Sequence, residues 1–326
     1  MVVIALVVGL TGCTARVPGS VSRPTPAGST SAAPYDGSCL GAAALAAPPG
    51  SCPATPTAPL VPALNIAAHD RSDAYPDVSH TADCFGHRPI FPMVICKRGV
   101  ATGTVRVALV GNSHAAEWLP AIERIASTEH WQITTYLASG CALAEVEESF
   151  SPTLGTRTCL AWVDETIAKV TEGSYDLVIM ANKISQSAVG ANIAGSWQPY
   201  ETGYARVLDA FHRAHLTVVG IHDSPAPVTV VVPTCLEHNL SDLSACDGTR
   251  TQWLPNDPLA AAVAGVHDPQ ITLLDLSNDI CAPTRCAAVV GRVIVYYDNS
   301  HLTATYARTL APYLEPALVA ALARHR

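Results

Sequence analysis

Ser113 lies where a predicted strand gives way to a predicted helix. The apolar run 105–110 (VRVALV) is typical of a buried strand, the turn 111–114 (GNSH) follows it, and a helical stretch begins near Ala115. In α/β proteins, active sites lie at the carboxyl ends of strands, and the unpaired N–H groups of a helix N-terminus can bind an oxyanion. Ser113 is therefore a candidate nucleophile, although a Gly-x-Ser at a strand end also arises by chance and needs partners.

A carboxylate and an imidazole follow the run RVIVYY near the other end of the chain. Asp298 and His301 are three positions apart in the sequence DNSHLT, so one turn can present the imidazole to a nucleophile while the carboxylate orients it. The same pattern also suits a helix N-cap, in which Asp298 or Ser300 satisfies backbone N–H groups. Because Ser113 supplies the missing nucleophile, we favour a triad in which His301 takes the proton of Ser113.

The elements that must position these residues alternate along the chain. Short apolar runs with turn signals predict strands at 105–110, 132–137, 176–181, 216–221 and 271–276. Helical patterns are expected near 116–128, 160–171, 201–214 and 303–324. Strands that alternate with helices predict a parallel sheet covered on both faces. We therefore expect an α/β, flavodoxin-like three-layer sandwich with a parallel sheet of about five strands.

Composition limits the class of protein. The 326 residues are 49% hydrophobic and 14% charged, which is enough apolar material for one large core. The formal net charge is -8, and no basic stripe is present that would neutralise phosphates. We therefore expect no nucleic-acid partner.

The chain begins with an apolar run, MVVIALVVGLTG, that precedes Cys13. It is shorter than the about 20 apolar residues that span a bilayer, and it lacks the Lys or Arg of a signal peptide. It is either a lipoprotein signal that ends at a lipidated Cys13, or the end of a transmembrane helix that begins upstream, or a hydrophobic leader with an incidental cysteine. The missing positive charge slightly favours the second. Each alternative predicts an extracytoplasmic protein, and the first two anchor it to the membrane.

The other ten cysteines fall into couples that are close in sequence. An even set in an exported chain is better explained by disulfide bonds than by metal or redox chemistry, and neither C-x-x-C nor zinc-finger spacing occurs. Connectivity is not fixed by sequence, but five disulfides are expected. The couples are Cys39/Cys52, Cys84/Cys96, Cys141/Cys159, Cys235/Cys246 and Cys281/Cys286.

Composition also predicts the domain organisation. Residues 1–13 form the anchor or signal, and 14–63 form a linker rich in Pro, Ser and Ala that cannot bury enough apolar surface to order itself. Residues 64–103 read as an irregular, disulfide-stapled lead-in. Residues 104–326 are the predicted catalytic domain, in which the long loop 222–260 is expected to form a wall of the substrate cleft.

The blocks GNSH at 111–114 and DNSH at 298–301 resemble the first and last blocks of the SGNH hydrolase superfamily. The resemblance covers about 105–325 and implies an oxyanion hole formed by the N–H groups of Ser113 and Gly140 and the amide of Asn182. Gly140 follows the second strand in LASGC, and Asn182 follows the third in MANK. Each also has a plain alternative, an ordinary turn glycine and an ordinary residue at a strand end.

Two positions depart from the superfamily pattern. The first block usually has Asp where this chain has Asn112, which keeps hydrogen-bonding ability but loses the charge. The third block is usually G-x-N-D, where this chain has Ala181, Asn182 and Lys183. His114 in the first block is predicted to be a structural hydrogen-bonding residue rather than a base.

A narrower resemblance rests on GNSHAAEWLPAIERIA, the cysteine-rich lead-in, the Gly140–Cys141 pair and DNSHLT. These are similar to the exported SGNH domain that is fused to membrane acyltransferase-3 proteins of actinobacteria. The resemblance implies that a membrane acyltransferase-3 domain supplies an acetyl or other short acyl group, which the SGNH domain places on a cell-envelope glycan. The apolar start of the chain would then be the end of the last membrane helix.

We therefore expect an extracytoplasmic serine esterase or O-acyltransferase that acts on acyl groups of envelope glycans through an acyl-serine. Its acceptor is water or a sugar hydroxyl, and it needs no metal or cofactor. The competing hypothesis is a non-catalytic glycan-binding or envelope-assembly protein that keeps the SGNH scaffold. The departures at Asn112 and Ala181 favour that hypothesis, whereas the intact Ser113, Asp298 and His301 argue against it.

Overall fold

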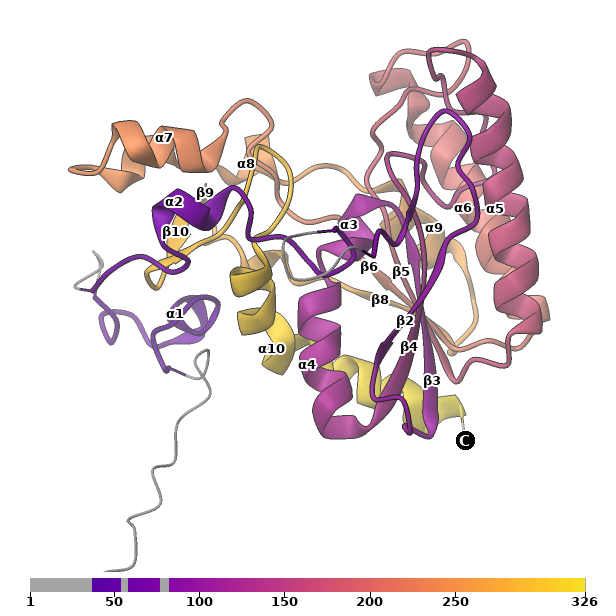
Figure 1. Ribbon diagram of the computed structural model, residues 1–326, viewed down its shortest axis with the longest axis horizontal. Coiled ribbons are helices and arrows are strands. Elements are labelled where there is room, and N and C mark those ends of the chain that lie inside the picture. Colours follow the sequence, from indigo (N-terminus) through magenta and orange to yellow (C-terminus); the bar gives the residue numbers. More distant parts are fainter. Residues whose placement is uncertain (1–36, 54–57, 77–81, 326) are drawn as a thin grey trace, which may run out of the picture. The chain divides into compact units, whose positions relative to one another are not determined.

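The computed structural model describes residues 37–53, 58–76 and 82–325 (Figure 1). The predicted anchor 1–13, with Cys13, lies outside the described residues, as does much of the predicted linker. Among the helices of the described ranges, none is both long and apolar enough to cross a membrane.

A mostly parallel sheet forms the centre of the fold, with the strand order β1-β4-β3-β5-β6-β8. Its five principal parallel strands are β3 (Val105–Gly111), β4 (Trp131–Ala138), β5 (Leu177–Ala181), β6 (Val218–Ile221) and β8 (Ile271–Leu274). They overlap the five apolar runs that predict strands. Nearly every residue of the inner strands is buried, as expected for strands covered on both faces. The α/β class is therefore confirmed.

Two more strands extend the sheet beyond β4. β1 (Phe85–Gly86) pairs in parallel with the end of β4, and β2 (Ile95–Gly99) pairs antiparallel with the rest of it. Both come from the segment expected to be an irregular lead-in, so the estimate of about five strands omitted two. β2 is half exposed, as is usual at a sheet edge.

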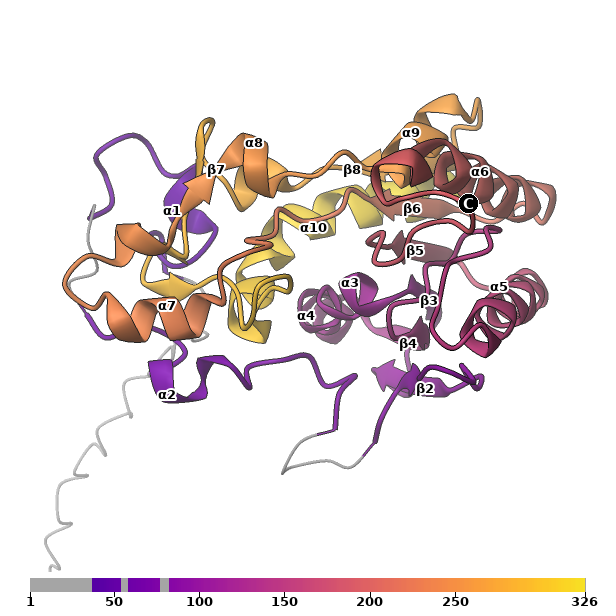
Figure 2. The ribbon, with the colours of Figure 1, turned by 90° about the horizontal axis from the view of Figure 1, so that it is seen from above.

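Helices cover both faces of the sheet (Figure 2). On one face, α4 (Leu119–Glu129) packs against α10 (Ala304–His325). On the other lie α5 (Leu154–Glu172), α6 (Trp197–Arg213) and α9 (Pro258–Gly265). Alternate residues of β3 enter the two cores, because successive strand side chains point to opposite faces: Val107 and Leu109 join one, Ala108 and Val110 the other.

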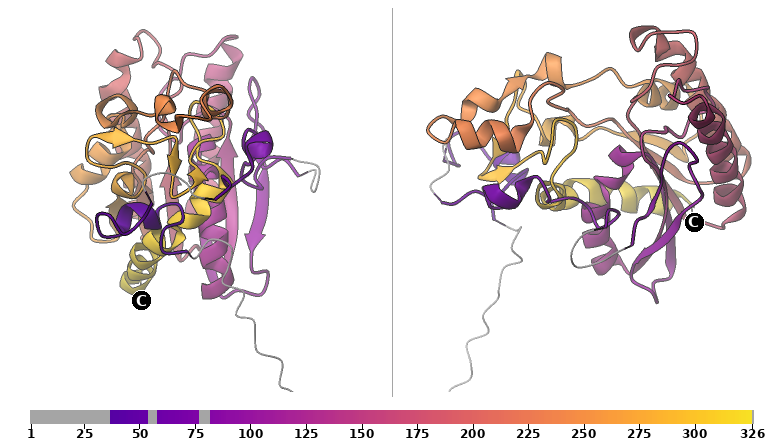
Figure 3. Two further views of the ribbon diagram at one scale, coloured as in Figure 1. Left: turned by 90° about the vertical axis from the view of Figure 1, so that its left-hand side faces the viewer. Right: turned by 45° about the horizontal axis from the view of Figure 1, so that its top comes forward.

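Short elements form a cap that shares the core of α4 and α10. Figures 1 and 3 show them gathered around the beginning of α10, away from α5 and α6. The helices of the cap are α1 (Ala43–Ala46), α2 (Leu64–Ala67), α7 (Val232–His238) and α8 (Arg250–Trp253), with 3-10 turns η2 (Leu243–Cys246) and η3 (Ser277–Asp279). Its strands are β7 (Gly248–Thr249), β9 (Arg285–Cys286), β10 (Val289–Val290) and β11 (Val293–Ile294). Outside the cap lie the short helix α3 (Ser113–Ala116), after β3, and the 3-10 turn η1 (Ala194–Ser196), before α6.

Disulfide bonds join the five couples that are close in sequence. Cys84–Cys96 connects the start of β1 to β2, and Cys141–Cys159 connects the loop after β4 to α5. Three more bonds lie in the cap: Cys39–Cys52, Cys235–Cys246 and Cys281–Cys286. The loops that surround the sheet are therefore covalently restrained.

Candidate active site

The turn that carries Ser113 is built for a close approach of two strands. Gly111 has a φ of +139°, and a Cβ at this position would lie 1.9 Å from the carbonyl oxygen of Ala181. Only glycine fits such a position. Ser113 then begins the single-turn helix α3, directly after β3. The nucleophile candidate thus lies at the carboxyl end of a central strand, as expected.

The structure brings Ser113, His301 and Asp298 together. Nε2 of His301 lies 2.8 Å from Oγ of Ser113, and Nδ1 of His301 lies 2.8 Å from Oδ2 of Asp298. Because the carboxylate holds the proton on Nδ1, Nε2 is left to accept the proton of Ser113. This is the geometry of a nucleophile, a base and an orienting group.

Asp298 also binds the backbone of its own turn, but it is not the helix N-cap that the sequence offered as an alternative, because α10 begins at Ala304 and Oγ1 of Thr303 accepts the N–H of Tyr306. Its Oδ1 accepts backbone N–H groups from Ser300 and His301, each at 2.7 Å. Burial raises the pKa of Asp298, but the hydrogen bond and charge of His301 outweigh burial and leave the pKa below its usual value. The carboxylate is therefore ionised, which is the state that stabilises an imidazolium.

The ring of His301 is held from behind by an aromatic stack. Tyr297 lies parallel to it at a centroid distance of 5.3 Å, and Tyr75 hydrogen bonds to Tyr297. Asp70 lies nearby in the chain and accepts the N–H groups of Ala304 and Thr305, which begin α10. Segment 70–75, which precedes β1, thus supports the stretch 297–305 that carries Asp298 and His301. Nothing in the local sequence singles these residues out.

Asn182 lies beside the nucleophile turn with its amide oriented. Its Oδ1 accepts the N–H of Leu143 at 2.9 Å and would lie 3.0 Å from a Cβ at Gly111. Its buried Nδ2 has no partner among the described residues. An unpaired buried N–H group is costly, so it is expected to serve a ligand.

Gly140 follows β4 and has a φ of +74°, with open space where a Cβ would lie. The neighbouring N–H groups of Ser139 and Cys141 bond to carbonyl groups of Gly86 and Ala138. No described residue accepts the N–H of Gly140. Its backbone donor is therefore available at the same sheet edge as Ser113.

Glu148 fixes the loop that follows Gly140. It is buried, and its Oε1 accepts the N–H of Ala142 at 2.7 Å. Burial raises its pKa to about 8, against the opposing effect of that hydrogen bond. Cys141–Cys159 ties the same loop to α5. Sequence reasoning missed Glu148, because it is one of several acidic residues in the stretch EVEE.

The departure at Asn112 has a structural reason. Its Nδ2 donates to the carbonyl oxygen of Lys183 at 2.7 Å, while its Oδ1 accepts the N–H groups of Lys183 and His114. An ionised Asp cannot donate to a carbonyl group. Asn112 therefore joins the first block to the third, which removes it as an argument for a non-catalytic scaffold.

Segment 222–260, predicted to be a loop that forms a wall of the substrate cleft, contains the short elements α7, η2, β7 and α8 and contacts the turn that carries Asp298 and His301. Asn299 Nδ2 donates to the carbonyl oxygen of Val228, and the N–H of Val232 donates to the carbonyl oxygen of Asp298.

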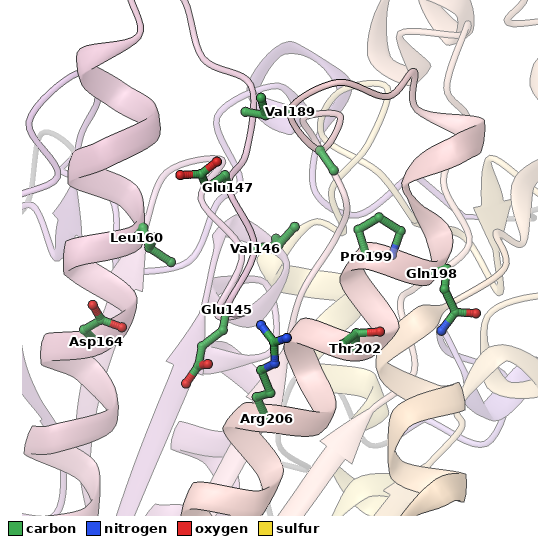
Figure 4. A pocket seen from close by; sticks show the side chains of 11 residues that line it. Glu145, Val146, Glu147, Leu160, Asp164, Val189, Gln198, Pro199, Thr202 and Arg206 are labelled. Atoms are coloured by element: carbon green, nitrogen blue, oxygen red, sulfur yellow. The ribbon is translucent and has the colours of Figure 1, made fainter.

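A cavity of about 650 Å³ lies elsewhere, between α5 and α6, and neither Ser113, Asp298 nor His301 lines it (Figure 4). Figure 4 shows Glu145 and Arg206 close together, with Asp164 on the neighbouring helix α5.

Comparisons with known proteins find similarity over most of the chain. A sequence model described as "SGNH domain (fused to AT3 domains)" matches residues 82–316, which includes β1 and β2. The periplasmic domain of the lipopolysaccharide acetyltransferase of Salmonella ser. Paratyphi A is similar in fold, with 13% identity and a TM-score of 0.52 over 68% of this chain and 85% of that one. A GDSL-like lipase from Bacteroides thetaiotaomicron has 12% identity and a TM-score of 0.37, over 66% and 88%. Among curated protein sequences, none matches this chain.

Proposed function

Because the chain belongs to the family of SGNH domains fused to AT3 domains, as its sequence blocks predicted, we propose that Ser113, His301 and Asp298 form the catalytic triad of an esterase or O-acyltransferase. The family is one of acyl esterases and acyl transferases. The observation that carries the proposal is the continuous hydrogen-bonded chain from Ser113 Oγ through His301 to Asp298, with both distances at 2.8 Å.

The first half-reaction forms an acyl-serine. Ser113 Oγ attacks the carbonyl carbon of an ester while His301 Nε2 takes its proton, and ionised Asp298 stabilises the imidazolium. The tetrahedral oxyanion is bound by the N–H groups of Ser113 and Gly140 and by Nδ2 of Asn182. Collapse of this intermediate breaks the bond between the carbonyl carbon and the leaving oxygen. The leaving alkoxide then receives from His301 the proton that came from Ser113.

The second half-reaction reverses the roles. His301 takes a proton from the acceptor hydroxyl, whose oxygen attacks the acyl-serine, and then returns the proton to Ser113 Oγ. The acceptor is water in an esterase and a sugar hydroxyl in a transferase. The same three oxyanion donors serve both steps.

The partners and the compartment are proposed from several lines of support. The similar Salmonella domain is periplasmic and belongs to a lipopolysaccharide acetyltransferase, and the matching family is fused to AT3 domains. Five disulfides fit an oxidising compartment. We place the chain outside the cytoplasm, tethered through 1–13 by a lipidated Cys13 or a membrane helix, with an acyltransferase-3 domain as donor and an envelope glycan as acceptor of acetyl groups.

Hydrolysis of 4-nitrophenyl acetate tests the chemical step. The wild-type protein should release nitrophenolate with saturating kinetics, and Ser113→Ala should not exceed the rate without protein. Ser127→Ala is the matched control, since Ser127 is exposed on α4 and its hydroxyl donates to the carbonyl oxygen of Arg124 in the same helix. Equal rates for wild type and Ser113→Ala would refute the proposal. Added monosaccharides that appear in acetylated form would identify a transferase.

A further inference from the structure

The dipeptide Ser-His occurs twice in the site, at 113–114 and at 300–301, and each serine contacts the histidine of the other pair. Ser113 Oγ lies 2.8 Å from His301 Nε2, and Ser300 Oγ lies 3.1 Å from His114 Nε2. The two imidazole rings are adjacent, with centroids 4.9 Å apart. We propose that His114 is a positioning residue that holds the loop of His301 in reach of Ser113 through Ser300. This inference rests on the proposed function.

His114 has its own carboxylate. Its Nδ1 lies 2.6 Å from Oδ1 of Asp223, and both side chains are nearly fully buried, at 1% and 6% exposed, whereas His301 and Asp298 are 18% and 34% exposed. Burial raises the pKa of Asp223, but the charge and hydrogen bond of His114 outweigh burial and leave it below the usual value. The ionised carboxylate orients His114 with Nδ1 toward Asp223 and Nε2 toward Ser300.

Ser300 does not have the surroundings of a second nucleophile. The backbone N–H groups of Ser300 and His301 both donate to Asp298 Oδ1. They are therefore not free to bind an oxyanion on an acylated Ser300. The hydroxyl of Ser300 is left with the role of a tether between the catalytic loop and the buried His114.

Glu117 provides a second tether on the other side of His301. Its Oε2 accepts the N–H of Leu302 at 3.0 Å, and its Oε1 accepts the hydroxyl of Ser224 at 2.6 Å. Ser300 and Leu302 flank His301 in the chain, so the catalytic base is held from both sides. Both tethers come from 114–117, the residues directly after Ser113.

This arrangement fixes the distance between nucleophile and base within one short segment. The turn that presents Ser113 also carries His114 and Glu117, which hold the loop of His301. Since a displacement of about 1 Å can lower a rate on the order of 10²-fold, loss of a tether should reduce kcat while leaving substrate binding unchanged.

Ser300 offers the test that least disturbs folding, because it is only partly buried. Ser300→Ala should lower kcat for 4-nitrophenyl acetate by about 10- to 100-fold, with KM unchanged within about twofold. Ser300→Thr retains the hydroxyl and should restore kcat to within about threefold of wild type. Ser127→Ala removes an exposed hydroxyl on α4 that donates to the carbonyl oxygen of Arg124 in the same helix, and it should behave as wild type.

A double-mutant cycle shows whether His114 acts through Ser300. His114→Gln should lower kcat as Ser300→Ala does, and the double variant should be no slower than the slower single variant. Wild-type kcat in folded Ser300→Ala, or multiplicative losses in the double variant, would overturn the inference. If His114→Gln does not fold, the comparison of kcat between Ser300→Ala and Ser300→Thr still tests whether the Ser300 hydroxyl positions His301.

A measurement that does not depend on turnover separates this inference from the proposed function. The Nδ1 proton of His301 should exchange with solvent more slowly in wild type and in Ser127→Ala than in Ser300→Ala, as followed by NMR of histidine-labelled protein. Equal exchange rates would contradict the positioning role, even if wild type proved inactive toward esters. An inactive wild type with faster exchange in Ser300→Ala would instead refute only the proposed function.

Discussion

The two sides of Ser113 are built from different chemistry. The proposed acid–base side comprises Asp298–Leu302 with His114 and Asp223; its carboxylates contact histidines, and the pKa values of Asp298 and Asp223 lie below their usual range. The proposed oxyanion side comprises Gly140–Glu148 with Asn182; it presents N–H donors, and its buried carboxyl group keeps its proton because burial raises the pKa of Glu148 to about 8.

This difference matches what acyl transfer requires. A proton must move on one side of the nucleophile, so groups that accept and stabilise positive charge belong there. Negative charge develops on the other side, where fixed neutral donors stabilise it and an ionised carboxylate would oppose it. The two sides are also held differently, the first by hydrogen bonds from 114–117 and the second by a disulfide bond and Glu148.

The largest effect is expected on the acid–base side. His301→Ala should lower kcat by about 10⁴-fold or more, because the nucleophile then loses its base. The thermal midpoint should change little, since His301 is partly exposed. Retention of more than a tenth of the wild-type rate would show that another group acts as the base.

The oxyanion side should give the next largest effect. Asn182→Asp keeps an oxygen for the N–H of Leu143 but replaces the free donor with a second carboxyl oxygen. We expect kcat to fall on the order of 10²- to 10³-fold, while KM remains near the wild-type value. Kinetics at pH 7 that match wild type would remove Asn182 from the oxyanion hole.

The pH dependence should separate the two sides by the sign of their response. The folded state binds one more proton than the unfolded state between the ordinary pKa of Glu148, 4.5, and its raised value of about 8. Stability should therefore fall as pH rises through that window, on the order of 5 kcal/mol in total. Glu148→Gln should flatten this slope, as measured by urea unfolding at several pH values.

Asp298 and Asp223 respond in the opposite direction. Their folded pKa values are lowered, so the stability they contribute is present at neutral pH and is lost as pH falls below the usual carboxyl pKa of 3.8. Asp298→Asn should therefore reduce acid sensitivity but leave the slope between pH 4.5 and 8 intact. A slope that disappears in Asp298→Asn and persists in Glu148→Gln would reverse the assignment.

The smallest effect should come from the remote support of the acid–base side. Asp70→Ala removes the acceptor of the Thr305 N–H at the start of α10 and should cost about 1 kcal/mol of stability, typical of a lost helix cap. The control is Asp209→Ala, which breaks an exposed ion pair with Arg213 and should cost less. Equal unfolding midpoints for the two variants would argue against support of α10 by segment 70–75.

The sequence predicted the regular half of the fold and the residues that the proposed reaction uses. Buried strands such as β3 and β5 are apolar throughout, so their runs stand out, and the blocks around Ser113 and His301 are local in sequence. The sequence did not predict β1 and β2, because a two-residue strand and a half-exposed edge strand leave no clear pattern of apolar residues.

The contacts that support the site could not be predicted from the sequence, for a different reason. The pairs His114–Asp223 and Asn112–Lys183 join residues that are far apart in the chain, and their meaning depends on which loops the sheet brings together. Glu148 is one acidic residue among several until its burial is known. The prediction of His114 as a hydrogen-bonding residue was possible from its block, but its partners were not.

Intact-mass analysis after reaction with a fluorophosphonate probe tests the central claim most directly. The probe forms a covalent bond only with a serine that a neighbouring base activates. The account predicts a single adduct on wild type, located on the peptide that contains Ser113, no adduct on Ser113→Ala, and a slower adduct on Ser300→Ala. An unlabelled wild type, or a Ser113→Ala variant labelled as fast as wild type, would contradict it.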